Sequence, residues 1–380
     1  MKNTVKHLSS LALAASMAFS LAACGGSSAA SSGAAAAPAA SGAAAASGSS
    51  DALKGAEYLS GDYTPLPADG PTFELTLGHA GAETAFQHEF CTAFASALSY
   101  YSDGKIHVTV YPNSQLGSDS EIIASVIAGD VDIAYQSGST HASLVPETQI
   151  FDTPFLFSGY DMDKIQQILT AGEFRDLYDA ANEKAGLKCL LVCAATSMNL
   201  TSNRPVTTLE DFKGLKIRTA QSESRMAIWS ALGANPTPLA FSELYMALQN
   251  GTVDAQDNSF ENAVTSGAAE VQKYLIPTQS MMPSMDLTMN LNKFNSMPQE
   301  YQDLILKISD ELLAYDIATL RTTDQGFHDQ LINEYGLEEC ELTDDVRTQM
   351  REAAAPAVNA VKAAVNNDAL YTALQSELDA

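Results

Sequence analysis

The sequence predicts an α/β protein built from two similar α/β domains around a hinged cleft, with a long helix near its C-terminal end. Three observations support this fold. Segments with strand-like alternation of apolar residues and segments with helix-like spacing follow one another along the chain. In addition, a helix–glycine–strand unit occurs twice, and an unusually long helical pattern lies near the C-terminal end. The 310 residues from Pro71 to Ala380 are enough for two domains of ordinary size.

The N-terminal residues are typical of a secretory signal. Lys2 and Lys6 precede an apolar stretch over residues 8–23, and Cys24 follows directly after Leu-Ala-Ala. The stretch is too short to span a membrane comfortably, and a polar segment follows it, so we expect residues 1–23 to be removed. A cysteine at this place resembles a bacterial lipobox, in which the thiol is acylated and becomes the mature N-terminus. An ordinary cleavage site nearby is the alternative.

A flexible linker is expected after Cys24. Residues 25–50 are 26 consecutive alanine, glycine, serine and proline residues, none of which brings a charge or a side chain able to build a core. Such a segment holds a folded body away from a bilayer without fixing its orientation. We therefore predict a lipidated cysteine and a linker over residues 24–70, with the folded part beginning near residue 70.

The net charge excludes one class of partner. The chain carries 46 acidic and 20 basic residues, a formal charge of −26, so it does not bind nucleic acid. An anionic ligand would be repelled at long range and would need local cations to hold it. Five of the 20 basic residues lie between positions 204 and 225, which makes this window the first place to look for a ligand: Arg204, Lys213, Lys216, Arg218 and Arg225.

Four further cysteines lie in the exported part of the chain: Cys91, Cys189, Cys193 and Cys340. One or two disulfides are possible in an oxidising compartment. Cys189 and Cys193 share one face of a predicted buried strand over residues 187–193, where their spacing sets them too far apart to bridge. Buried free thiols are therefore favoured for this pair.

The first half of the chain alternates between strand and helix patterns. Residues 72–79 alternate like a strand, residues 86–100 have helical spacing, and residues 105–111 alternate again. Ser118 and Glu121 form a capping box that begins a further helix. Gly129 ends this helix, and a strand over residues 131–135 follows.

The same helix–glycine–strand unit recurs about 120 residues later. Its first copy, marked by Glu121, Gly129, Val131 and Asp132, corresponds to Glu243, Gly251, Val253 and Asp254 in the second. Four residues beyond each aspartate, Gln136 and Asn258 are predicted just past the carboxyl ends of their strands, where open α/β sheets bind ligands. Chance similarity of two short units is the alternative.

A long helix is predicted after Pro298. Its apolar face contains Tyr301, Leu304, Ile305, Ile308 and Leu312, and the pattern continues toward Leu331 with no breaker before Gly326. Such a helix could brace both domains, and a surface helix on one sheet fits the periodicity equally well.

From about residue 72 to about residue 315 the chain resembles the DctP-type solute-binding subunit of tripartite ATP-independent periplasmic (TRAP) transporters. The densest match covers three segments: Leu-Glu-Asp-Phe-Lys-Gly-Leu-Lys-Ile-Arg over 209–218, Leu-Gly-Ala-Asn-Pro-Thr-Pro over 232–238, and residues 241–258 from Phe-Ser-Glu-Leu-Tyr to Val-Asp-Ala-Gln-Asp-Asn. The resemblance implies two α/β domains with a hinge and a long helix that crosses both. The first domain would be formed by residues 71–195 plus about 284–323, and the second by residues 196–283 plus about 324–380.

The resemblance also implies a function. Proteins of this family capture a small organic acid outside the cytoplasm and deliver it to the integral membrane subunits of the transporter. With Cys24 acylated, the chain would be lipid-anchored to the outer face of the cell membrane or periplasmic. Neither a cofactor nor a metal is expected.

The family's ligand-binding residues carry over onto named positions. Arg218 would hold the ligand carboxylate, which suits a guanidinium because it presents paired donors and stays charged when desolvated. Asn258 would hydrogen-bond the ligand from the second domain, and Phe241 would form an apolar wall. Gln221 is a further candidate.

Four residues of the first domain are candidates because they fall in loops expected at the cleft: His79, Asp119, Gln136 and Ser137. Two of them have alternatives. Asp119 could serve only as a helix cap, and His79 could be a solvent-facing strand end.

The chain departs from the sialic-acid-type members of the family at one informative position. Those members have Gly-Thr-Arg where this chain has Thr-Ser-Met over 196–198, so the second arginine is replaced by Met198. A methionine packs against an apolar group and does not pair with a carboxylate. Sialate is therefore disfavoured as the ligand. A monocarboxylate, or a diacid held in another way, is still a possible ligand. Asp257 and Ala255, where the family usually has glutamate and glycine, are conservative changes.

Two other classes of function are alternatives. An exported hydrolase would need a catalytic constellation, and the chain contains no Gly-x-Ser-x-Gly, His-Glu-x-x-His, Walker or Gly-x-Gly-x-x-Gly motif. An enzyme is therefore not expected. A lipid-anchored ligand-binding module of a sensory system would have the same cleft, and a neighbouring permease or sensor gene would separate these two functions.

Overall fold

The computed structural model describes residues 53–157 and 160–380. The predicted signal over residues 1–23, the lipidation site Cys24 and most of the predicted linker lie outside these residues. None of the helices in the described part combines the length and apolar character needed to cross a membrane.

The first of two sheets has the strand order β2-β1-β3-β10-β4. Strands β1, β2 and β3 are parallel, and β10 runs antiparallel to both β3 and β4. The bounds are β1 (Phe73–Gly78), β2 (Ile106–Tyr111), β3 (Ile133–Ser137), β4 (Leu187–Ala194) and β10 (Ser284–Asn290). The sheet therefore combines strands from the first half of the chain with one from a much later segment.

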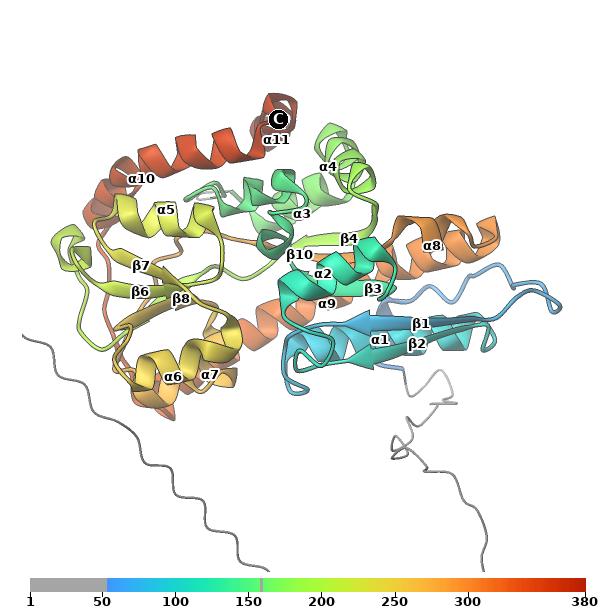
Figure 1. Cartoon of the computed structure of the whole chain (residues 1–380), viewed down its shortest axis with the longest axis horizontal. Helices are drawn as coiled ribbons and strands as arrows, with labels where there is room; N and C mark the ends of the chain where they lie inside the picture. Colours follow the sequence, from blue (N-terminus) through green and yellow to red (C-terminus); the bar gives the residue numbers. More distant parts are fainter. Residues whose placement is uncertain (1–52, 158–159) are drawn as a thin grey trace, which may run out of the picture. The chain divides into compact units, whose positions relative to one another are not determined.

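Helices and 3-10 turns surround this sheet, and together they form the first lobe (Figure 1). The helices are α1 (Phe86–Tyr101), α2 (Asp119–Ala128), α3 (Met162–Thr170), α4 (Glu173–Lys184) and α8 (Leu291–Asn295). The 3-10 helices are Ala56–Tyr58, Gly138–His141 and Pro146–Asp152. The C-terminal helix α11 (Asp368–Asp379) packs on α3 and α4 of this lobe.

The second sheet has the order β11-β9-β5-β8-β6-β7 and is the centre of the second lobe. Strands β6, β7 and β8 are parallel, whereas β5 is antiparallel to β8 and β9. The strands are β5 (Asn199–Ser202), β6 (Lys216–Thr219), β7 (Asn235–Pro238), β8 (Ala255–Asn258), β9 (Tyr274–Ile276) and β11 (Glu338–Glu339). The helices are α5 (Glu223–Ala231), α6 (Leu244–Gln249), α7 (Phe260–Thr265) and α10 (Asp344–Val365), with 3-10 helices Leu209–Phe212, Phe241–Glu243 and Ala268–Val271.

Both copies of the predicted helix–glycine–strand unit are present. In the first lobe α2 ends at Gly129, which has φ 89°, and β3 follows. In the second lobe α6 is followed by Gly251, with φ 69°, and then by β8. A positive φ suits glycine because it has no Cβ to clash. The repeat therefore places a parallel strand and the helix before it at corresponding points of the two sheets.

A single long helix, α9 (Gln299–Asn333), contacts both lobes (Figure 1). It packs on α1 and β4 of the first lobe and on α7 of the second. Gly326 does not end it, and the predicted apolar residues from Tyr301 to Leu312 are buried. The prediction that this helix spans both domains is confirmed.

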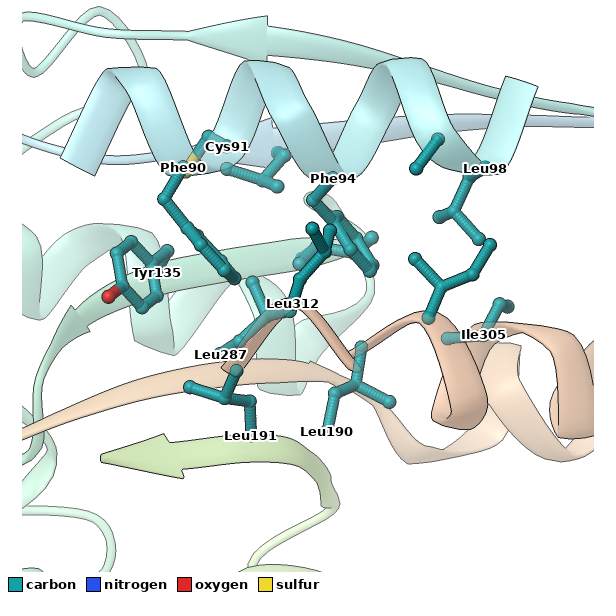
Figure 2. Close-up of a cluster of buried hydrophobic side chains, with 14 of the residues drawn as sticks. Phe90, Cys91, Phe94, Leu98, Tyr135, Leu190, Leu191, Leu287, Ile305 and Leu312 are labelled. Atoms are coloured by element: carbon teal, nitrogen blue, oxygen red, sulfur yellow. The ribbon is translucent and has the colours of Figure 1, made fainter. Parts of the chain in front are cut away.

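A large core cluster lies between α1 on one side and β10 and α9 on the other, as Figure 2 shows. Phe90, Phe94 and Leu98 come from α1 and meet Leu287 of β10 and Leu312 of α9. The three residues of α1 repeat at four-residue spacing, which sets them on one face of their helix. The cluster thus ties the sheet of the first lobe to the helix shared with the second.

All four cysteines of the described part are buried free thiols: Cys91, Cys189, Cys193 and Cys340. This confirms the prediction for Cys189 and Cys193, which belong to different core clusters of the first lobe. Burial raises the pKa of the Cys193 thiol well above its ordinary value, and the neighbouring Asp316 reinforces the effect. Cys193 is therefore a core residue and not a nucleophile.

The structure differs from the predicted linker at its C-terminal end. Tyr58, Leu59, Tyr63 and Leu66 pack against the first core cluster, and the Tyr63 hydroxyl donates to the Glu311 carboxylate on α9. Their apolar and aromatic side chains set residues 58–66 apart from the alanine-rich segment before them. The folded body therefore begins before residue 70.

Candidate functional site

A cavity of about 370 Å³ lies between residues of the two lobes. Its walls include the loops that follow the parallel strands β1, β2 and β3 in the first lobe and β6, β7 and β8 in the second. The carboxyl ends of parallel strands are where α/β proteins bind ligands. The cavity is therefore the candidate binding site.

Arg218 is a cationic wall residue of this cavity. It belongs to β6, and its side chain is only 3% exposed. Its Nε–H and Nη2–H groups donate to the Leu239 carbonyl oxygen at 3.1 and 2.8 Å, which fixes the guanidinium and leaves Nη1 without a protein partner in the described part of the chain. The loop after β7 thus fixes the orientation of the Arg218 guanidinium in the cavity wall.

The charge of Arg218 is poorly compensated. Within residues 53–157 and 160–380, no carboxylate oxygen lies within 4.0 Å of its guanidinium nitrogens. Burial lowers the pKa of Arg218 to about 10, and the neighbouring Arg225 adds to this effect, while Asp257, Asp119 and Glu243 oppose it. The group stays protonated at neutral pH and forms a buried positive site that an anion would stabilise.

Phe241 stands next to this cation. The guanidinium carbon of Arg218 lies 5.9 Å from the centroid of the Phe241 ring. The ring is half-buried and lines the cavity. Phe241 thus supplies an apolar surface that also stabilises the cation beside it.

Asn258 lies at the end of β8 and is 6% exposed. Its Oδ1 accepts hydrogen bonds from the Asn262 amide at 2.9 Å and from the Ser259 main chain at 3.2 Å. In the described residues its Nδ2 has no partner, so Asn258 presents a fixed hydrogen-bond donor to the cavity.

Arg225 also lines the cavity, and the sequence predicts no role for it beyond its place in the cation-rich window. It lies on α5, with Nε 3.6 Å from the Asp152 carboxylate of the first lobe and Nη2 3.0 Å from the Ser139 hydroxyl. Asp152 is fully buried and also accepts from Ser222 and Ser224, at 3.1 and 2.6 Å. Arg225 is therefore charge-compensated, and it joins the two lobes.

Two of the four first-domain candidates line the cavity, Asp119 and Ser137. Both are half-buried. Burial raises the pKa of Asp119 to about 6, although the charge of Arg218 acts in the opposite direction. The Asp119 carboxylate makes no hydrogen bond within the described part of the chain, so it does not cap the helix. The Ser137 hydroxyl donates to the Ser139 hydroxyl at 3.4 Å.

The other two, His79 and Gln136, are not among the lining residues. Gln136 lies inside β3 rather than beyond it, and its amide donates to the Asp119 main-chain oxygen at 3.0 Å. His79 is fully buried with its Nε2 3.2 Å from His88 Nδ1. Burial first and the charge of His88 second lower the pKa of His79 to about 4. Gln136 therefore contacts a lining residue, Asp119, without lining the cavity itself.

Gln221 and Met198 complete the predicted set, and both line the cavity. Gln221 is exposed. Met198 is 6% exposed, and its sulfur lies 3.9 Å from Arg225 Nη1. In the described residues, no group of three or more histidine, cysteine, aspartate or glutamate side chains could hold a metal ion.

Two α/β lobes joined by a long helix around a polar cavity define a periplasmic-binding-protein fold, the class of protein that captures solutes. Residues 77–364 match DctP, the bacterial extracellular solute-binding proteins of family 7, and the chain belongs to this family. These proteins are the extracytoplasmic solute-binding components of TRAP transporters, and they are not enzymes.

Individual relatives agree with this assignment. Solute-binding protein RD1_1052 of Roseobacter denitrificans is 30% identical over 258 residues, which cover 67% of this chain and 78% of the relative. The 2,3-diketo-L-gulonate-binding periplasmic protein YiaO of Escherichia coli is 31% identical over 238 residues, which cover 62% of this chain and 72% of YiaO.

Solved structures agree as well. A TRAP periplasmic solute-binding protein from Desulfovibrio salexigens with bound orotic acid superposes with a TM-score of 0.77 at 25% identity, covering 81% of this chain and 99% of that chain. The sugar acid binding protein DctPAm from Advenella mimigardefordensis, in complex with galactonate, gives a TM-score of 0.75 at 28% identity, with the same coverage of 81% and 99%.

Proposed function

We propose that this chain binds a small organic acid in the cavity between its lobes and delivers it to the integral membrane subunits of a TRAP transporter. A lipid on Cys24 would hold it at the outer face of the cell membrane. The observation that carries the proposal is Arg218, a buried guanidinium that faces the cavity with no carboxylate within 4.0 Å in the described residues. A ligand carboxylate would supply the missing charge.

The residues around Arg218 suit this role. Nη1 of Arg218 and Nδ2 of Asn258 are donors left unused by the described part of the protein. Phe241 would pack against the carbon skeleton of the ligand, with Met198 on another wall. Gln221, Ser137 and Asp119 would contact its polar groups, whereas His79 and Gln136 would support the first-lobe wall from behind.

Ligand binding would couple to closure of the two lobes. Arg218 and Asn258 belong to the second lobe, whereas Asp119 and Ser137 belong to the first. A ligand that contacts both sets favours the closed arrangement over an open one, and the membrane subunits would recognise the closed form. The proposed domains are those expected from the sequence, except that α11 makes its contacts with the first lobe.

Relatives support the class of ligand. The galactonate complex and the orotic acid complex named above each concern a carboxylic acid. So does a TRAP solute-binding protein from Bradyrhizobium in complex with galacturonate, which superposes with a TM-score of 0.74 at 25% identity. The anionic charge that these three molecules share is the property that Arg218 would recognise.

A thermal-shift screen tests the proposal. The purified protein, dialysed from denaturant to remove bound ligand, would be heated with carboxylic acids, neutral sugars and amino acids. Because a ligand of the native state raises the melting temperature by mass action, we expect a rise with one class of acids. A rise with neutral sugars or cationic amino acids, and with no acid, would contradict the proposal.

A further inference from the structure

Few of the described residues that line the cavity have a charged side chain. Among the described residues that line it, four are ionisable: Asp119, Glu121, Arg218 and Arg225. The other polar side chains are the neutral hydroxyls and amides of serine, threonine, asparagine and glutamine. The position of each charge therefore limits how many carboxylates a ligand can bring into the cavity.

Two of the four charges are already engaged by the protein. Arg225 Nε lies 3.6 Å from the Asp152 carboxylate, and its Nη2 donates to the Ser139 hydroxyl. The Glu121 carboxylate accepts from the Ser118 main chain at 2.8 Å and from the Ser118 hydroxyl at 2.7 Å, as part of the capping box of α2. Neither Arg225 nor Glu121 is therefore free to pair with a charged group of the ligand.

Arg218 and Asp119 are the two charges that remain. Within residues 53–157 and 160–380, Arg218 has no carboxylate within 4.0 Å and the Asp119 carboxylate accepts no hydrogen bond. The two groups face the same cavity from different lobes, and each influences the pKa of the other. A ligand therefore meets one free cation and one free hydrogen-bond acceptor that carries negative charge.

We infer that the ligand is a hydroxylated monocarboxylate, an acid of the aldonate kind, and that Asp119 selects it. This inference rests on the proposed function, in which Arg218 holds the single carboxylate. The Asp119 carboxylate would accept a hydrogen bond from a ligand hydroxyl, and it would repel a second carboxylate at the same place. The neutral hydroxyls and amides of the walls suit further ligand hydroxyls, because a buried polar group left unpaired costs binding energy.

Matched acids test the inference by calorimetry at pH 8, where Asp119 is ionised. Each polyhydroxy monocarboxylate is compared with the diacid on the same carbon skeleton: threonate with tartrate, gluconate with glucarate, and galactonate with galactarate. Hexanoate tests the need for hydroxyls. In a pair that binds, we expect the monocarboxylate to bind at least about tenfold more tightly than its diacid and than hexanoate.

The outcomes separate the inference from the proposed function. A diacid or hexanoate that binds as tightly as the hydroxylated monocarboxylate would overturn the inference and leave the organic-acid function standing. Failure of every acid to bind would contradict the proposed function itself.

Asp119→Asn tests the residue, with Asp130→Asn as its control. Asp130 is exposed, lies outside the cavity wall and undergoes the same loss of charge. Without the repelling charge, we expect Asp119→Asn to reduce the preference for monocarboxylate over diacid by at least about fivefold, and Asp130→Asn to leave it unchanged. If Asp119 only supported helix α2, both affinities would fall alike and the preference would stay, which would overturn the role proposed for Asp119.

Discussion

Arg225 and Asp152 form an ion pair beside the cavity in which each charge depends on the other. The Asp152 side chain is fully buried, and that of Arg225 is 6% exposed. Three serine hydroxyls, those of Ser139, Ser222 and Ser224, and the guanidinium satisfy the carboxylate. Removing one member of such a pair leaves a buried charge without compensation, which costs far more than the loss of a surface contact.

Asp152→Asn is therefore expected to lower the free energy of unfolding by about 3 to 5 kcal/mol. Urea denaturation measures this change. The control is Asp163→Asn, which removes the carboxylate partner of Arg321 in a pair where the side chains are 83% and 48% exposed. Solvent screens such a pair, so we expect little change. Equal effects of the two substitutions would contradict the assignment.

The positions of the candidate site residues could be predicted from the sequence to different degrees. Arg218, Asn258 and Phe241 follow from the family resemblance, and the structure places them on one cavity wall. The sequence singles out Arg225 only as one of five cations between positions 204 and 225, because its partner Asp152 lies far away in sequence. The burial of His79 could not be predicted, since only the folded chain brings its ring within 3.2 Å of His88 of α1.

At the scale of the elements, glycine has a different role in the repeated helix–glycine–strand unit and in the long helix α9. Gly129 ends α2 with φ 89°. Gly326 lies inside α9, and a Cβ added there would meet nothing within 4 Å. The first position needs glycine for its backbone conformation, whereas the second does not.

Alanine at these two glycines should change stability in opposite directions. Gly129→Ala is expected to lower the free energy of unfolding by about 1 to 2 kcal/mol, because alanine is strained at positive φ. Gly326→Ala should raise it by about 0.5 to 1 kcal/mol, because glycine loses more conformational entropy in a helix. Chemical denaturation of both variants checks the pair, and a loss at Gly326 or a gain at Gly129 would show that the backbone account is wrong.

The sequence predicts most of the helices and strands, but it does not predict the residues at which they begin and end. The predicted strand over residues 131–135 is β3 (Ile133–Ser137) in the structure. Antiparallel pairing with β10 extends it, since Ser137 pairs with Met285. That partner strand lies about 150 residues away in the sequence, so no local pattern reveals the pairing, and the local pattern places Gln136 in a loop instead.

At the scale of the whole molecule, an ionisable side chain is buried at a contact between the two lobes. Glu261 of α7 accepts a hydrogen bond from the Phe86 main chain at the start of α1, at 2.9 Å. It is 4% exposed. Burial, which outweighs the hydrogen bond, and the nearby Asp324 raise the pKa of Glu261 to about 7.

This raised pKa makes the stability of the protein depend on pH. Between pH 4.5, the ordinary pKa, and about 7, the folded chain keeps a proton on Glu261 that the unfolded chain releases. The free energy of unfolding should therefore fall as pH rises through this range, by up to about 3 kcal/mol from this group.

Glu261→Gln removes this dependence while keeping an acceptor for Phe86. Its free energy of unfolding relative to that of the unmodified protein should rise from pH 4.5 to about 7 and then level off. Denaturation curves across this range check the prediction, and parallel pH profiles for the two proteins would refute it.

The central claim is that Arg218 holds the carboxylate of the ligand. The most direct measurement is isothermal titration calorimetry of the acid that gives the largest thermal shift, with the unmodified protein and with Arg218→Ala. We expect Arg218→Ala to weaken binding by about 2 to 5 kcal/mol, because the buried ligand charge would lose its partner. A loss of less than about tenfold in affinity, about 1.4 kcal/mol, would contradict the claim.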